Sequence, residues 1–371
     1  MNCEIEFLPV GSASKPGDAI VVRYGETDAY ELMTIDGGNL DSGKLVVEHV
    51  RNNFGENAGI KHAVLTHSDA DHASGLREIL DGLPVENLWL HMPWGVVSEA
   101  RKYLADTKSS DDELTRKIVR EYDIIAEIVT KASKKTTKIY MPFAGHTIGP
   151  FQVLSPYKSF YTALMPQFDR TPDPDQAAIA AAQMWIGKQP SFIKVVADKV
   201  AAKVQKWIEE TWAKERLKDG GVTNPSNESS VILYGDFGNT RRVLLTGDGG
   251  AWALTYAAHY AEQKNFPLQQ FSFVQIPHHG GRRNVGPTIL NRLLGPIQPE
   301  GSATRFTALV SAPADDDSHP RKMVLNAFLR RGGKVIATQG ESIIHYGGFP
   351  RRDGYKAATP IPFSSKVEEY D

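Results

Sequence analysis

The sequence predicts a layered α/β protein, in which helices pack against the faces of β-sheets. Short strand-like runs separated by turn residues fill the first third of the chain, and similar runs return in the last third. Two stretches between them carry apolar residues at helical spacing. Because strands precede and follow helical blocks, a layered α/β fold is favoured over an all-β or all-α one.

The expected strands follow one another along the chain as short apolar runs ending in polar or glycine-containing turns. The first group lies at residues 4–8, 19–24, 30–35, 62–66 and 87–92, with a helix-compatible stretch near residues 75–80. A second group is expected at 138–141, 151–154, 230–234, 242–245, 271–276, 305–310, 334–338 and 342–345.

The two helical blocks are predicted from the helical spacing of their apolar residues. Across residues 111–132 the repeating apolar positions are Leu114, Ile118, Val119, Tyr122, Ile125 and Val129, and Ser109 and Ser110 are suitable N-caps. Across residues 175–217 an apolar stripe is formed by Val196, Val200, Val204, Trp207 and Ile208. This second block is expected to pack on its own domain, with a docking surface or a lid over the site as the alternative. Both blocks together could also form a docking surface for a protein partner.

Composition limits the class of protein. The 371 residues include 41% hydrophobic side chains, enough for a sizeable core. The length fits two domains as well as one large domain; we expect one domain over 1–371 with helical insertions at about 95–135 and 172–222. No apolar run reaches membrane-spanning length and no secretory signal is recognisable, so we expect a cytoplasmic protein that does not engage a membrane. The single cysteine, Cys3, excludes an internal disulfide and is expected in the core of the first strand. A net charge of −2 argues against a protein that coats nucleic acid.

The segment His67-Ser68-Asp69-Ala70-Asp71-His72 carries the strongest chemical pattern. It places two imidazoles and two carboxylates within six residues, directly after an expected strand. These groups are hard-to-borderline metal ligands that a tight loop can bring to one point. A solvated turn that caps the next helix is the alternative.

Three further segments place polar side chains after expected strands. Asp248 ends Thr246-Gly247-Asp248 after an apolar strand, where a carboxylate can bridge two cations. His278 and His279 follow another strand, and we expect one to be a ligand and the other a substrate contact. His319 follows the strand that ends near Val310 and is the weaker candidate, whereas His146 is left out because a strand follows it.

In these residues the sequence resembles the metallo-β-lactamase superfamily, specifically the metallo-hydrolase domain of ComEC-type DNA-uptake proteins. The usual His-x-His-x-Asp-His motif is replaced here by His67-x-Asp69-x-Asp71-His72, which is the variant of that branch. Supporting matches are Gly17-Asp18-Ala19-Ile20, Ile35-Asp36-Gly37-Gly38, Asn227 with Ser229-Ser230-Val231, Leu244-Leu245-Thr246-Gly247-Asp248, Pro277-His278-His279-Gly280 and His319-Pro320.

The resemblance implies an αββα sandwich with the site along one edge of the sheets. It implies that His67 and Asp69 hold one metal, that Asp71, His72 and His279 hold the other, and that Asp248 bridges them. Asp36 would orient the metal-binding loop. A further histidine of the superfamily is missing, because the chain has Leu154-Ser155-Pro156-Tyr157 at that place. The oxygen-rich ligand set shifts the expected pair of divalent cations from zinc towards manganese or magnesium.

The expected function is a metal-dependent hydrolase, most simply a phosphodiesterase or nuclease acting through a two-metal-activated water. Asp71, His278 and His319 are the expected catalytic residues, and His319 would bind substrate or protonate the leaving oxygen. Arg282 and Arg283 would hold the substrate phosphate. The alternatives are a hydrolase of another ester or amide, such as a lactone, and a metal-binding component of a larger multi-protein system.

Overall fold

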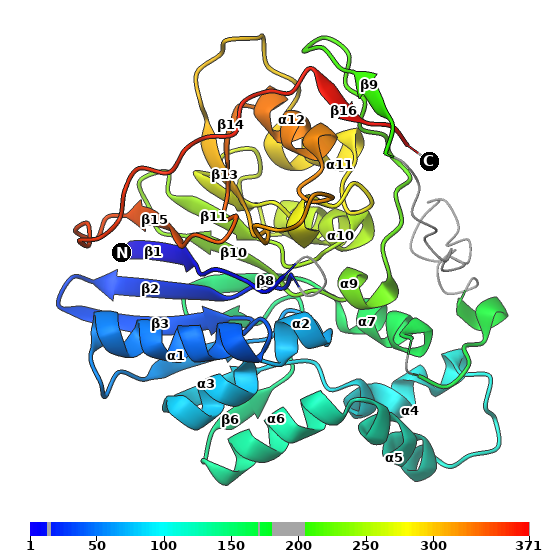
Figure 1. Ribbon diagram of the computed structural model, residues 1–371. Helices are drawn as coiled ribbons and strands as arrows, with labels where there is room; N and C mark the ends of the chain where they lie inside the picture. The colour runs from blue at the N-terminus through cyan, green and yellow to red at the C-terminus, as the bar shows by residue number, and fades with distance from the viewer. Residues whose placement is uncertain (13–15, 170, 180–204, 371) are drawn as a thin grey trace.

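The computed structural model describes residues 1–12, 16–169, 171–179 and 205–370. Two seven-stranded sheets lie face to face, and helices cover the outer face of each (Figure 1). Three apolar cores fill the spaces between these four layers, one between the sheets and one beneath each helical layer. The expected αββα sandwich is therefore confirmed.

Each sheet combines an antiparallel half with a parallel half. In the first sheet the strands from β15 to β3 pair antiparallel and those from β3 to β6 pair parallel. In spatial order they are β15 (Ile343–Gly347), β1 (Asn2–Phe7), β2 (Ile20–Glu26), β3 (Ala29–Ile35), β4 (Ile60–Val64), β5 (Val85–Trp89) and β6 (Lys138–Tyr140).

The second sheet repeats this division. Its strands from β14 to β11 pair parallel and those from β11 to β7 pair antiparallel. In spatial order they are β14 (Gly333–Ala337), β13 (Phe306–Val310), β12 (Phe273–Gln275), β11 (Arg242–Leu245), β10 (Ile232–Asp236), β8 (Phe151–Ser155) and β7 (Thr147–Ile148).

Side-chain alternation along the strands separates the cores. In β2, Ile20 and Val22 face the space between the sheets, whereas Val21 joins the core beneath the first helical layer. Strands buried on both faces need apolar residues at nearly every position, and this is why the sequence shows them as short apolar runs.

The helices divide between the two outer faces. Those in the core over the first sheet are α1 (Leu40–Phe54), α2 (Ala70–Ala73), α3 (Leu76–Gly82), η1 (Pro93–Val96), α4 (Val97–Ala100), α5 (Asp111–Glu121), α6 (Asp123–Lys134), α7 (Lys158–Leu164) and η3 (Met165–Gln167). The short η2 (Arg101–Tyr103) follows α4, and its Tyr103 packs in a small separate cluster with Ala163 and Ile179. Those over the second sheet are α10 (Ala251–Gln263), α11 (Pro287–Leu294) and α12 (Lys322–Arg330). The short α9 (Pro225–Glu228) and η4 (His278–Gly280) lie in loops near the site.

The first predicted helical block is present as α5 and α6, which meet at Tyr122. Ser110 is the N-cap of α5 and forms a capping box with Glu113, in which each side chain bonds the other's backbone N–H. Cys3 is buried in β1, as expected.

The second predicted helical block is partly wrong. Trp207 and Ile208 lie in a strand, β9 (Trp207–Glu209), which pairs antiparallel with β16 (Lys366–Glu368) near the C-terminus. The buried Glu210 that follows β9 pairs with the equally buried Arg330 of α12 at 3.1 Å, and this contact anchors the segment against the helix. Val196, Val200 and Val204 lie outside the described residues.

The predicted arrangement of a single domain with two helical insertions stays a prediction, because much of the second insertion falls outside the described residues. In the part of the chain that the structure describes, every helix is too short or too polar to cross a membrane.

Candidate metal centre

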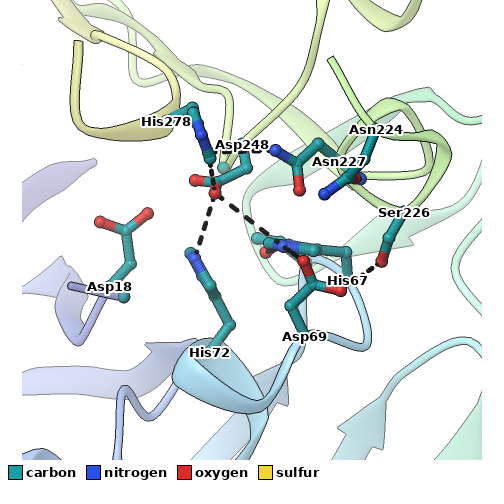
Figure 2. Close-up of polar contacts among 12 residues, drawn as sticks. Asp18, His67, Asp69, His72, Asn224, Ser226, Asn227, Asp248 and His278 are labelled. Carbon is teal, nitrogen blue, oxygen red and sulfur yellow. Dashed lines mark hydrogen bonds and ion pairs between the residues drawn. The ribbon is translucent and has the colours of Figure 1, made fainter. Parts of the chain in front are cut away.

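The candidate centre lies where the parallel strands of both sheets end. Asp36 follows β3, the segment 67–72 follows β4, Asp248 follows β11, and the pair 278–279 follows β12. Strands β3 and β4 are neighbours in one sheet, and β11 and β12 are neighbours in the other. Their loops meet across the gap between the sheets, so residues far apart in the sequence face one another (Figure 2).

Three buried imidazoles surround the carboxylate of Asp248. The Nε2 atoms of His67, His72 and His279 lie 4.0, 3.4 and 3.9 Å from its Oδ2 atom. Within the described residues, none of these Nε2 atoms has a hydrogen-bond partner, and neither has Oδ1 of Asp248. A buried polar atom left unsatisfied costs about 1–3 kcal/mol. These residues fall into overlapping groups that could each hold a cation, among them His67 with His72 and Asp248, and Asp71 with His72 and His279, so they fit the divalent metals that the sequence implies.

The second nitrogen of each imidazole is fixed by an acceptor. The Nδ1 atom of His72 lies 2.8 Å from Oδ2 of Asp36, and that of His279 lies 2.9 Å from the carbonyl oxygen of Ser311. Because carboxylates and carbonyls only accept hydrogen bonds, each Nδ1 carries a proton, and in the neutral imidazole each Nε2 then keeps its lone pair. This tautomer directs the lone pairs at the centre.

Asp36 occupies the orienting position that the resemblance implied. One of its oxygens accepts from the backbone N–H of Thr66 at 2.7 Å, and the other accepts from the Thr66 hydroxyl at 2.6 Å and from His72. The Thr66 hydroxyl oxygen also lies 3.0 Å from Nδ1 of His67. Asp36 therefore fixes both histidines of the loop, directly or through Thr66.

Asp69 and Asp71 flank the centre on the loop itself. Asp69 Oδ2 lies 3.6 Å from Nε2 of His67, and its Oδ1 accepts from the Ser226 hydroxyl at 2.6 Å. Asp71 offers an oxygen that groups with His72 and His279 within 4.8 Å. The structure thus brings together every residue that the sequence analysis named as a ligand.

His278 and His319 lie on the more exposed side of this cluster, with side chains 33% and 29% exposed. The Nδ1 atom of His278 lies 2.5 Å from Oδ2 of Asp248 and 3.0 Å from the side-chain amide nitrogen of Asn227. The rings of His278 and His319 are 6.4 Å apart, and Asp316 lies 3.1 Å from Nδ1 of His319. Both predicted catalytic histidines can therefore meet a substrate from the same side.

Burial and neighbouring charges both shift the pKa values of the residues in the centre. Burial disfavours the ionised form of Asp248, but His72, His278 and His279 outweigh it, so the pKa of Asp248 lies well below its usual range. Burial would likewise lower the pKa of His72, yet the carboxylates of Asp248 and Asp36 raise it well above the usual value. Burial lowers the pKa of His279 to about 4. The carboxylates therefore require positive charge here, from protons or from a cation.

The two predicted phosphate-binding arginines have different surroundings. Arg282 donates to the carbonyl oxygen of Glu369 at 2.8 Å and lies over the Tyr370 ring, 4.8 Å from its centroid. The C-terminal segment therefore engages its guanidinium. Arg283 is exposed, and its backbone packs against Gly221.

A pocket of about 290 Å³ opens beside Asp69 and Asp71. Its wall comes from the junction of α5 and α6, from the chain after η3, and from the start of α9. The lining residues combine apolar and acidic side chains: Ser68, Ala70, Tyr122, Asp123, Ile124, Ile125, Phe168, Asp169, Asn224, Pro225 and Ser226.

Sequence reasoning gave no role to four residues in or around the cluster. Asp18 and Asn227 stood in the motifs that carry the resemblance but received no role. Ser226, which donates to Asp69, and Gln275, which donates to Asp18, had no distinguishing sequence pattern. Their roles depend on long-range packing that a single sequence does not display.

No protein-family model matches the chain, and no curated protein matches it in sequence. Among solved structures it is similar to the metallo-β-lactamase fold protein YhfI from Bacillus subtilis, with 9% identity over 94% of this chain and 100% of that one and a TM-score of 0.42. Zn²⁺-bound PqqB from Methylobacterium extorquens gives 12% identity over 92% and 99% of the two chains, with a TM-score of 0.38. A long-form RNase Z from yeast gives 11% identity over 93% of this chain and 41% of its own, with a TM-score of 0.36. Likeness this distant assigns no substrate.

Proposed function

We propose that the chain is a metal-dependent hydrolase, and that it cleaves a phosphodiester bond with two divalent cations. One observation carries the proposal: three buried imidazole Nε2 atoms without hydrogen-bond partners among the described residues surround one carboxylate, Asp248. When bound, a pair of divalent cations at such a centre acts as a Lewis acid and makes water a nucleophile near neutral pH.

The chain's own residues would divide this work by position. His67 and Asp69 would hold one cation, and Asp71, His72 and His279 the other, with Asp248 between them. His278 would donate a hydrogen bond to the substrate or transfer a proton, since its exposed ring is oriented through Nδ1 by Asp248. His319, oriented by Asp316, would protonate the leaving oxygen from the same side.

Replacing Asp248 tests the centre directly. Asp248→Asn keeps the shape of the side chain but removes its charge, so we expect bound metal to fall and hydrolysis to drop by more than about a hundredfold. Metal content by elemental analysis and rates in manganese, zinc and magnesium are the measurements. Asp41→Asn, at a side chain that is 88% exposed, is the matched control. Full metal content and full activity in folded Asp248→Asn protein would rule out the centre.

A second candidate, hydrolysis of an uncharged ester or lactone, is favoured by the lining of the pocket. Tyr122, Ile124, Phe168 and Pro225 offer apolar surface beside the centre, whereas Asp123 and Asp169 would repel a polyanion. A panel of phosphodiesters, lactones and amides, tested in each metal, separates the two candidates. Activity on lactones alone would leave the metal centre standing and remove the phosphodiester.

The substrate role of Arg282 and Arg283 stays a prediction within this proposal. Since Arg282 is engaged by Glu369 and Tyr370, Arg283 is the more available of the two for a phosphate. Assignment to the ComEC-type branch, which the loop variant suggested, also stays a prediction.

A further inference from the structure

Asp18 is a buried carboxylate that lies beside His72 of the candidate centre. Asp18 lies two residues before β2, which belongs to the first sheet. Its hydrogen-bond partner, Gln275, belongs to β12 of the second sheet. Gln275 donates from Nε2 to Oδ2 of Asp18 at 2.8 Å. Figure 2 shows the Asp18 carboxylate directed into the space beside His72 and Asp248.

The orientation of Gln275 is unambiguous. Its Oε1 atom accepts from the backbone N–H groups of Thr246 and Gly247, at 2.9 and 3.1 Å. Its amide nitrogen must therefore point at Asp18, and Oδ2 of Asp18 is the acceptor. The same amide thus fixes Asp18 and the backbone just before Asp248, which places the two carboxylates relative to each other.

The neighbouring Gly17 brings Asp18 close to the centre. Gly17 has a φ of +58°, and a Cβ atom there would lie 1.9 Å from the backbone oxygen of Asp71. On its other side, the Ser311 hydroxyl donates to the Gly17 carbonyl at 3.2 Å, and the Ser311 carbonyl is the acceptor for His279. The loop therefore sits between the backbones that carry Asp71 and the acceptor of His279.

The second oxygen of Asp18, Oδ1, lies in the protein interior near the Ser311 side chain. Oδ1 is buried and has no hydrogen-bond partner in the part of the chain that the structure describes. Asp18 groups with Asp36 and His72, with one ligand atom of each within 4.8 Å of the others. Asp36 uses both of its oxygens in hydrogen bonds to Thr66 and His72, so of these two carboxylates Asp18 is the one with an oxygen to offer.

We propose that Asp18 supplies an oxygen ligand to the cation held by Asp71, His72 and His279. This inference rests on the proposed function, because it requires the metal centre. A carboxylate in this place would give the second cation an additional hard oxygen and would strengthen the preference for manganese or magnesium.

The test is metal binding by Asp18→Asn. Asparagine keeps the shape and can still accept from Gln275, so a merely structural Asp18 would be replaced without loss. We expect metal-free Asp18→Asn to bind the first cation normally and the second about 10–100-fold more weakly, in titrations with Mn²⁺ followed by calorimetry and by electron paramagnetic resonance. The matched control is Glu228→Gln, which also changes a buried carboxyl group to an amide but lies outside the proposed ligand set. This variant should bind both cations with wild-type affinity.

Each outcome decides a different question. Wild-type affinity for both cations in folded Asp18→Asn would overturn the role of Asp18 alone. Failure of the wild-type protein to take up any cation would instead remove the proposed function. Should Asp18→Asn fail to fold, a crystal structure of the wild type with Zn²⁺ settles the point, since a ligand oxygen must lie at about 2.0–2.2 Å from the ion. A longer separation from both cations would contradict the proposal.

Discussion

The Thr66 hydroxyl illustrates how a single small side chain orders the metal centre. It donates to Asp36, and its oxygen is then free to accept from Nδ1 of His67. Asp36 meanwhile holds Nδ1 of His72. One carboxylate thus selects the tautomer of two proposed ligands, and it would contribute to metal binding without touching the metal.

Asp36→Asn should weaken metal binding while the protein stays folded. The asparagine amide group presents N–H where His72 and Thr66 need an acceptor, so His72 would lose the bond that keeps its proton on Nδ1. We expect the affinity for divalent cations to fall about 10–100-fold. Competition with a chromophoric chelator measures this, with Asp41→Asn as the control. Undiminished affinity would show that the tautomer of His72 is set in another way.

At the residue scale, candidate ligands could be predicted from the sequence where several of them lie close together in the chain. The segment His67 to His72 and the pair His278-His279 stand out because several metal-binding side chains are neighbours in the chain. Asp18 could not be assigned in this way, because its significance depends on Gln275, which is 257 residues away. The choice of His279 as ligand agrees with its buried, unpartnered Nε2 among the described residues.

At the scale of elements, helix α10 shows how the chain caps a helix from a distance. Its N-cap is Gly250, which has no side chain to bond the exposed backbone N–H groups. Glu228, on α9, accepts instead from the backbone N–H of Ala253 at 2.8 Å. A Cβ atom on Gly250 would lie 2.1 Å from Oε1 of Glu228, so glycine is what allows the carboxylate to approach.

Glu228→Gln should change how stability depends on pH. Burial raises the pKa of Glu228 to about 7 from its model-compound value of 4.5. The folded protein thus holds this proton more tightly than the unfolded chain does. The protonated Glu228 side chain therefore adds to the free energy of unfolding below pH 4.5, and this contribution is lost as pH rises to about 7. The loss is on the order of 3 kcal/mol. We would measure the free energy of unfolding of both proteins by chemical denaturation between pH 4 and 8. It should fall with rising pH in the wild type more than in the variant. Parallel curves would contradict it.

The same scale shows why some elements were predictable and others were not. Strands such as β11, buried on both faces, appear as apolar runs between turns. Helix α10 buries one face made largely of alanines, Ala253, Ala257, Ala258 and Ala261. It also carries the apolar side chains of Trp252 and Tyr256 outside that face, so its apolar residues do not form a clear stripe in the sequence. β9 was mistaken for helix because its pairing with β16 lies at the far end of the chain.

At the scale of the whole molecule, both sheets contribute residues to the candidate centre, so the proposed cations would bind only when the two sheets are packed together. A ligand that binds the folded state alone stabilises it by mass action. The centre therefore links the first and second halves of the sandwich energetically as well as geometrically.

Metal removal should lower the melting temperature. At a free cation concentration about a hundredfold above Kd, binding stabilises the folded state by about 2.7 kcal/mol. Scanning calorimetry of metal-loaded and chelator-treated protein measures the difference, which should amount to several degrees. Asp248→Asn should melt at the same temperature with and without added cation. An equal response of wild type and Asp248→Asn would place the stabilising cations elsewhere.

The hydrogen bond between Asp18 and Gln275 also bears on the order of events during folding. During synthesis, Asp18 and the loop from His67 to His72 leave the ribosome long before Gln275 and His279 exist, and the two ends of this hydrogen bond are 257 residues apart. A cation arriving early would find only the ligands of the first half. The complete centre can form only when β11 and β12 of the second sheet have packed against the first sheet, so we expect both cations to bind late in folding.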